Sequence, residues 1–413
     1  MRDIIYYYTD YVKGGSALRE GKGMDDATTA PAGPTIYELI AGTPETRRTS
    51  GNFRHSVREV LTIVVLCELC GGHSARKYAA WGRENEGWLR ARGLELPHGV
   101  PSHHTFSRVF AVLPPTVLKC LERRWSQGLR DLDDGEVVAV DGKALKHAST
   151  DGVHVPYVVS AWASGAGFVM GELKTDEKSN EITAIPRLLE AIGDEIADCV
   201  ITTDAAGCQR EVAAVSVDVC RADYVLGLKG NQQNMHDEFL ELFDTCQKAF
   251  PDRFRDATKV EKNGGRVEVR HCVQTDYVEW FADLPKWRGL RSVIMVESER
   301  TTGKGTMFER RLYASSLPMD AENAQRCVRA HWGVENGLHW TMDVVFREDD
   351  CRARARNAAE NRAILRHLLV AVARRKGAEL GLSAGGVCFK AVCSREFLSE
   401  MVFGADAAKR VAA

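Results

Sequence analysis

The chain has 413 residues, of which 44% are hydrophobic and 27% are charged, and its formal net charge is −2 at pH 7. This composition is typical of a globular protein with room for two domains. It contains no apolar run long enough to span a bilayer, and MRDIIYYYTD is not a signal-peptide pattern, so we expect a cytoplasmic protein. The balanced charge does not by itself indicate a nucleic-acid binder, although basic residues gather between positions 352 and 376.

The first 130 residues predict an irregular arm followed by a helical domain. Residues 1–33 are rich in Gly, Ser, Thr, Ala and Pro, which favours an irregular lead-in. Apolar residues then recur at helical spacing through SVREVLTIVVLCELCGG, where the paired glycines end the helix. In PSHHTFSRVFAVLPP, Ser102 or Thr105 is suited to cap a helix that the prolines stop. We therefore predict an all-helical N-terminal domain over residues 34–130.

Cys67, Cys70 and His73 have the spacing of half a zinc site. No second pair of ligands with matching spacing follows them, and both cysteines lie in an apolar helical run. We interpret them as small core residues.

From about Gly135 the periodicity changes to that of a mixed α/β domain. Strands are predicted at 136–141, 153–163, 167–175, 199–203 and 224–228, and helices at 182–192, 209–215 and 231–250. A β-rich segment follows at about 253–317, and helices return from residue 321 to about 375. This α/β domain is predicted to span 131–375, and 376–413 is predicted to be a C-terminal tail.

Two aspartates end predicted strands of this domain. Asp141 ends the strand in VVAVDGK, and Asp204 ends the strand in VITTDAAG. Ligands of an open α/β sheet bind outside the carboxyl ends of its strands, and Mg²⁺ prefers carboxylate oxygens. Two ions at such a site can activate an attacking oxygen and stabilise the leaving oxygen of a phosphodiester.

A third carboxylate would complete such a site. The predicted helix 324–340 presents Glu335 on one face with His331 and His339. The residues themselves do not choose Glu335 over its neighbours Asp343, Glu348, Asp349 and Asp350.

Eight blocks in order along the chain resemble the H-repeat-associated transposases of bacterial insertion sequences, a DDE-type family. These blocks are PSHHTFSRVF (101–110), VVAVDGKALK (137–146), VSAWAS (159–164), KSNEITAIPRLLE (178–190), TTDAAGCQ (202–209), ADYVLGLKGNQ (222–232), GRVEVR (265–270) and VRAHWGVENGLHWTMDVVFREDD (328–350). The resemblance implies a ribonuclease-H-like DDE catalytic domain over residues 131–375, in which residues 253–317 are an insertion. It also implies that the helical domain 34–130 is the family's transposase-associated domain, which is expected to bind DNA. It also implies that Asp141, Asp204 and Glu335 are the catalytic metal ligands.

The resemblance further implies the reaction and its partners. Two Mg²⁺ ions, with Mn²⁺ as a substitute, are expected to support cleavage at the transposon ends and strand transfer into target DNA. The expected partners are double-stranded DNA, with its terminal inverted repeats, and a second copy of the chain on that DNA; no membrane is expected, and the protein would be nucleoid-associated. The chain departs from better-studied relatives in having Val328, His331 and Met342 where those relatives have Tyr, Arg and Lys around the glutamate.

Further side chains around these motifs are candidates for DNA contacts. Lysines and arginines near the strand ends can bind phosphates, and tryptophans beside Glu335 can stack on an unpaired base, although tryptophans are more often core. The candidates are Lys143, Lys229, Asn231, Arg266, Arg270, Trp332 and Trp340.

Three alternatives remain at this point. The chain could be a DNA-binding protein without catalysis, a ribonuclease-H-like nuclease without strand transfer, or a zinc-dependent regulator built on Cys67, Cys70 and His73.

Overall fold

A computed structural model describes residues 34–51, 53–149, 155–175, 181–263, 265–303 and 305–405. All of them belong to one compact unit, Pro34–Ala413, and the predicted N-terminal arm lies outside the described residues. Among the helices in these ranges, none combines the length and apolar content needed to cross a membrane.

The N-terminal region is helical, as predicted. Its helices begin at well-formed caps: Ser56 accepts a hydrogen bond from the Glu59 amide in a capping box, and Ser102, rather than Thr105, caps the helix predicted there. The helices are α2 (Ile36–Ala41), α3 (Val57–Leu69), α4 (Ala75–Glu84), α5 (Glu86–Ala91), α6 (His103–Val112) and α7 (Pro115–Ser126).

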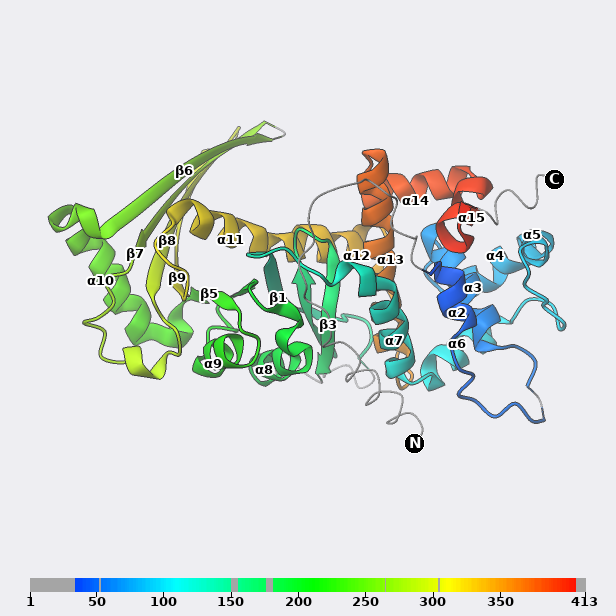
Figure 1. The fold of residues 1–413 in the computed structure, drawn as a ribbon. Coiled ribbons are helices and arrows are strands. Elements are labelled where there is room, and N and C mark those ends of the chain that lie inside the picture. Colours follow the sequence, from blue (N-terminus) through cyan, green and yellow to red (C-terminus); the bar gives the residue numbers. More distant parts are fainter. Residues whose placement is uncertain are drawn as a thin grey trace, which may run out of the picture. The chain divides into compact units, whose positions relative to one another are not determined.

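The α/β region begins with five strands in the order β3-β2-β1-β4-β5. They are β1 (Val137–Ala144), β2 (Tyr157–Ala163), β3 (Phe168–Thr175), β4 (Val200–Thr203) and β5 (Asp223–Leu228). β1 pairs antiparallel with β2 and parallel with β4, and β4 pairs parallel with β5. Together with α8 (Glu181–Ile192) and α9 (Arg210–Asp218), this is the predicted ribonuclease-H-like arrangement (Figure 1).

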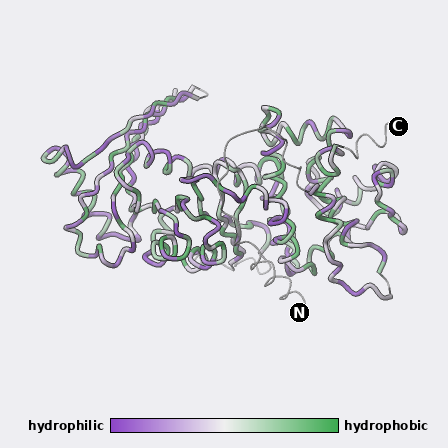
Figure 2. Tube along the Cα trace, viewed as in Figure 1, coloured by the Kyte–Doolittle hydropathy of each residue, from purple (hydrophilic) through white to green (hydrophobic). Residues whose placement is uncertain are grey.

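The β-rich segment forms four long antiparallel strands that extend the same sheet (Figure 1). They are β6 (Phe254–Asn263), β7 (Arg266–Thr275), β8 (Ser292–Thr302) and β9 (Gly305–Ser315). β9 pairs antiparallel with β5, for example Leu226 with Ala314, so the sheet has nine strands. The inner ends of β8 and β9 are buried, whereas their outer ends are exposed and mostly hydrophilic (Figure 2).

Helices cover the two faces of this sheet separately. Alternate residues of β1 point to opposite faces: Val138 packs with α8, α9 and α10 (Gln233–Ala249), whereas Val137 packs with α11 (Ala321–Gly333). After α11 the helix continues as a π-helix, η7 (Val334–His339), and then as α12 (Trp340–Val344). A π-helical turn is rare and often marks a functional site.

The C-terminal residues correct one prediction. In place of a tail from residue 376, α13 (Ala358–Leu380) is followed by α14 (Ala384–Cys393) and α15 (Arg395–Phe403). Their buried side chains, such as Leu398 and Val402, belong to the same apolar core as those of α2 and α3. Two short amphipathic helices thus complete the N-terminal helical core from the far end of the chain.

Buried charges also join α3 to the C-terminal helices. Arg366 of α13 is fully buried and pairs with Glu68 of α3 and with Glu348. Glu348 lies in η8 (Glu348–Asp350), just after α12. Burial of an unpaired charge is costly, so each member of this cluster depends on the others.

Candidate active site

β1 and β4 bring Asp141 and Asp204 to one edge of the sheet. Val140 pairs with Thr203 in parallel register, and each aspartate is the next residue along its strand. Since neighbouring strands are about 4.8 Å apart, the two carboxylates emerge side by side. The predicted end of the first strand was wrong: β1 runs on to Ala144 against β2, and Asp141 marks the point where β1 loses its β4 neighbour.

Backbone amides orient both carboxylates. Asp141 Oδ1 accepts a hydrogen bond from the Gly142 amide at 2.8 Å. Asp204 Oδ1 accepts one from the Ala206 amide at 2.9 Å, which fixes the turn after β4. The Asn231 side chain holds the same turn, because its Nδ2 donates to the Ala205 carbonyl at 2.6 Å.

The helix α11–η7 places Glu335 over this edge. Four residues before it, His331 lies with Nδ1 3.0 Å from Thr202 Oγ1 on β4, and four residues after it, His339 lies with Nδ1 3.6 Å from Asp141 Oδ2. Glu335 therefore lies on the same side of the helix as His331, which contacts β4, and His339, which contacts Asp141. Burial lowers the pKa of His331 to about 4 and that of His339 to about 3, so both imidazoles are neutral at pH 7.

The pKa of Glu335 also depends on its surroundings. Partial burial raises the pKa of its carboxyl; the Arg311 guanidinium opposes this rise, and Asp204 adds to it. No basic side chain in the described ranges forms an ion pair with Glu335.

The competing carboxylates are each paired with a cation. Glu348 is buried against Arg366, and the other three form ion pairs closer to the surface: Asp343 with Lys143 at 2.7 Å, Asp349 with Lys146 at 2.5 Å, and Asp350 with Arg347 at 2.6 Å. This leaves Glu335 as the carboxylate of that region best placed to act with Asp204.

Sequence reasoning missed a fourth carboxylate beside Asp141. Glu181, in the first turn of α8, is buried, and a Cβ on Gly142 would lie 2.7 Å from its Oε1 and 2.2 Å from Tyr157 Cε1. Burial raises the pKa of Tyr157, and Glu181, Asp141 and Asp204 raise it further. Only glycine fits at position 142, and the glutamate in the KSNEITAIPRLLE block was the available signal.

This chemistry suits a hard divalent cation. Carboxylate oxygens are the ligands that Mg²⁺ prefers. Burial is the main cause of the raised pKa values of Glu335 and Tyr157, and the neighbouring carboxylates, which a cation would neutralise, add to it. In the described part of the chain, no three His, Cys, Asp or Glu side chains already converge closely enough to form a metal cage. Cys67 is buried, its thiol pKa is raised by that burial, and it fits the interpretation as a core residue.

The proposed DNA-contacting side chains differ in availability. Lys229 and Trp340 are exposed, and Arg266 is half-exposed. Lys143 is largely buried in its ion pair with Asp343. Arg270 is buried between two carboxylates, Glu261 and Glu268 at 2.8 Å each, so its contacts lie within the sheet rather than with solvent.

The basic C-terminal stretch does not form one open surface. Arg362 is buried against Tyr78, Arg366 is buried between carboxylates, and Arg374 stacks on the buried Trp162 with its charged centre 5.5 Å from the ring. Other arginines of the stretch are exposed: Arg352, Arg354, Arg356 and Arg375. The arginines that gather in the sequence are therefore divided between core contacts and the surface.

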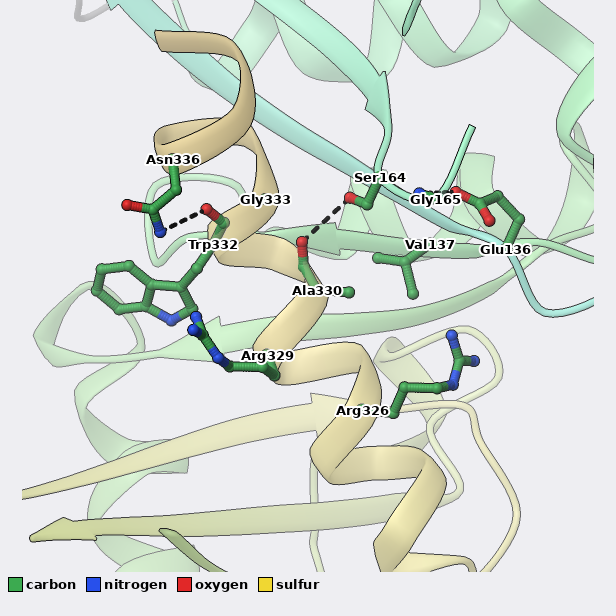
Figure 3. A pocket seen from close by; sticks show the side chains of 10 residues that line it. All are labelled: Glu136, Val137, Ser164, Gly165, Arg326, Arg329, Ala330, Trp332, Gly333 and Asn336. Atoms are coloured by element: carbon green, nitrogen blue, oxygen red, sulfur yellow. Dashed lines mark hydrogen bonds between the residues drawn. The ribbon is translucent and has the colours of Figure 1, made fainter. Parts of the chain in front are cut away.

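A pocket of about 390 Å³ lies on another flank of α11 (Figure 3). Ser164 Oγ donates to the Ala330 carbonyl at 3.1 Å at its wall, and Arg326, Arg329 and Asn336 line it. Val137 also lines the pocket. With the usual rise per residue of a strand, Val137 lies about 13 Å from Asp141 along β1, so the pocket is separate from the carboxylates.

Comparisons with known proteins agree with this architecture. The model of the DDE_Tnp_1-associated family matches residues 38–126, and that of the transposase DDE domain matches residues 133–372. The H repeat-associated putative transposase YhhI of Escherichia coli (strain K12) is 32% identical over 342 residues, which are 81% of this chain and 89% of that protein. The putative transposase YncI of Escherichia coli O157:H7 is 32% identical over 333 residues, 79% of this chain and 84% of that protein. An uncharacterized protein in the dhlA 3′ region of Xanthobacter autotrophicus is 34% identical over 297 residues, 71% of this chain and 97% of that protein. The chain therefore belongs to the DDE transposase family.

Proposed function

We propose that this protein cuts DNA at the ends of an insertion sequence and joins those ends to target DNA, with Asp141, Asp204 and Glu335 as the catalytic carboxylates. The observation that carries the proposal is the geometry of η7. Contacts on either side of Glu335 reach β4 and Asp141, while the rival carboxylates are paired with cations.

Each carboxylate has a defined part in this proposal. Asp141, Asp204 and Glu335 would hold two Mg²⁺ ions, with Mn²⁺ as a substitute. When bound, such ions supply activation of the attacking oxygen and stabilisation of the leaving oxygen. A water molecule attacks the phosphodiester at the transposon end and releases a 3′-hydroxyl, which then attacks a phosphodiester of the target. The neutral His331 and His339 fix the helix without competing for the phosphate.

The test uses duplex DNA that carries the inverted repeats flanking the coding sequence in its genome. We expect Mg²⁺- or Mn²⁺-dependent cleavage by the wild type and loss of cleavage in Asp141→Ala, Asp204→Ala and Glu335→Ala, with DNA binding retained. A pre-cut end should give a strand-transfer product, and two copies of the chain should occupy one pair of ends. Cleavage without a joined product would indicate a nuclease, and binding without cleavage would indicate a protein without catalysis. Stoichiometric zinc in the purified protein would favour the regulator built on Cys67, Cys70 and His73.

A further inference from the structure

Arg311 of β9 lies on the α11 side of the sheet, beside the proposed site. It pairs across the strands with Val296, which packs in the same apolar cluster as α11. Its guanidinium carbon is 4.6 Å from the centre of the Trp332 ring, so the cation stacks on a tryptophan of α11. The pairing of β9 with β5 therefore brings a residue of the β-rich segment next to the residues at the end of β4.

The positive charge of Arg311 affects the pKa values of both Glu335 and His331. It lowers the pKa of Glu335 against the effect of burial, and it contributes to the lowered pKa of His331. On the helix itself, His331 and His339 are uncharged at pH 7. The positive charge beside Glu335 thus comes from the sheet and not from the helix that carries the glutamate.

Arg311 contacts Tyr313, which is buried, and Glu309, and the Glu309 contact is easily displaced. Arg311 Nε and Nη2 both donate to one oxygen, Glu309 Oε1, at 2.8 Å each. The Glu309 side chain is 54% exposed, and an exposed ion pair contributes only about 0–1 kcal/mol. A phosphate offers two oxygens to the same N–H groups and can accept one hydrogen bond on each, in the bidentate geometry that Glu309, with a single accepting oxygen, does not provide.

The other cations near the carboxylates are less available. Lys143 is 11% exposed and paired with Asp343. Arg329 of α11 lies 3.7 Å from Glu261 and lines the separate pocket. Arg310, the neighbour of Arg311, points to the opposite face, where it pairs with Asp244 of α10 and with Glu297.

We propose that Arg311 is a substrate-binding residue: stacked on Trp332, it takes the phosphate of the DNA strand being cut in place of Glu309. This inference rests on the proposed function for the identity of the strand. It assigns the β-rich segment a direct part in holding the reacting phosphate, through Arg311 in addition to the sequence candidates Arg266 and Arg270.

The first test measures binding and needs no catalysis. A series of duplexes carries the terminal repeat, and in each duplex one phosphate around the repeat end is replaced by a neutral methylphosphonate. The affinity of each duplex is measured with Ca²⁺ in place of Mg²⁺. In the wild type, neutralising the contacted phosphate should weaken binding about tenfold, the effect of one charge-assisted contact. In Arg311→Met, that same modification should have no further effect, whereas in Arg310→Met it should weaken binding as in the wild type.

The second test measures cleavage. Removing one donor from a site that stabilises developing charge costs about 100-fold in kcat, so Arg311→Met should cut about 100-fold more slowly at saturating DNA. It should also bind the unmodified repeat about tenfold more weakly, because it has lost the one phosphate contact. Arg311→Lys keeps the charge but not the fork, so it should recover part of the rate. Glu309→Gln, which removes the competing carboxylate, should cut at least as fast as the wild type.

The outcomes separate this inference from the proposed function. If Arg311→Met and the wild type respond alike at every methylphosphonate position, or if Arg310→Met loses as much cleavage, the inference is overturned. If the wild type does not cleave but the methylphosphonate effect still depends on Arg311, the proposed function fails while the phosphate contact stands.

Discussion

Glu335 and Glu348 are the two glutamates in the last matched block, and the structure predicts opposite consequences for their loss. Glu348 is 4% exposed and pairs with Arg366, which is fully buried. Breaking a buried ion pair costs about 3–5 kcal/mol. We expect the lower end of this range here, because Arg366 keeps Glu68 as a partner when Glu348 is lost. Glu335 is exposed at the surface, and partial burial of its carboxyl and the charge of Asp204 disfavour the ionised form while Arg311 favours it. Its neutralisation should therefore change stability by no more than about 0.5 kcal/mol.

The assay compares Glu335→Gln and Glu348→Gln by urea unfolding and by cleavage of the repeat duplex. We expect Glu348→Gln to lower the urea midpoint by about 1 M or more, and any cleavage it loses should follow the loss of folded protein. Glu335→Gln should keep the wild-type midpoint and lose cleavage entirely. Asp343→Asn, which frees Lys143, is the matched control and should keep its activity. If Glu348→Gln were as stable as the wild type yet inactive, the assignment of the third carboxylate would be wrong.

Three further predictions concern pH, the arginines of β7 and metal binding. Burial lowers the pKa of His331 from 6.5 to about 4, so the unfolded chain binds this proton first and stability should fall as pH drops from 6.5 towards 4. In metal-free protein His331→Gln should remove about 1.4 kcal/mol per pH unit from that slope, measured by urea unfolding near pH 5–6; an unchanged slope would contradict it. Arg270→Ala should cost about 2 kcal/mol of stability because it removes the nearest cation from both Glu261 and Glu268, whereas Arg266→Ala should leave stability unchanged and reduce the salt dependence of DNA binding. The reverse pattern in these two variants would show that Arg270 is the DNA contact. Saturating Mg²⁺ should raise the melting temperature of the wild type but not of Asp204→Asn, as expected for a ligand that binds only the folded state; equal shifts in both would place the ion elsewhere.

The sequence by itself determined much of the fold. The spacing of apolar residues indicates which side of a helix or strand is buried. This was enough to predict the N-terminal helices, the strands before Asp141 and Asp204, and the helix that carries Glu335. The boundary errors are informative. β1 continues past Asp141 because β2 still pairs with it, and no local pattern records the length of a neighbouring strand.

Only the tertiary structure decided which distant segments meet. The pairing of Leu226 with Ala314 makes the β-rich segment part of the main sheet, and it thereby sets Arg311 beside Glu335. The burial of Leu398 with the N-terminal helices likewise turned a predicted tail into core. Among the candidate carboxylates, spacing left Glu335 and Glu348 equal. Their environments differ, because Glu335 lies on the helix that contacts the strand ends, whereas Glu348 pairs with the buried Arg366. The charged partners of a carboxylate are set by folding rather than by its position in the chain.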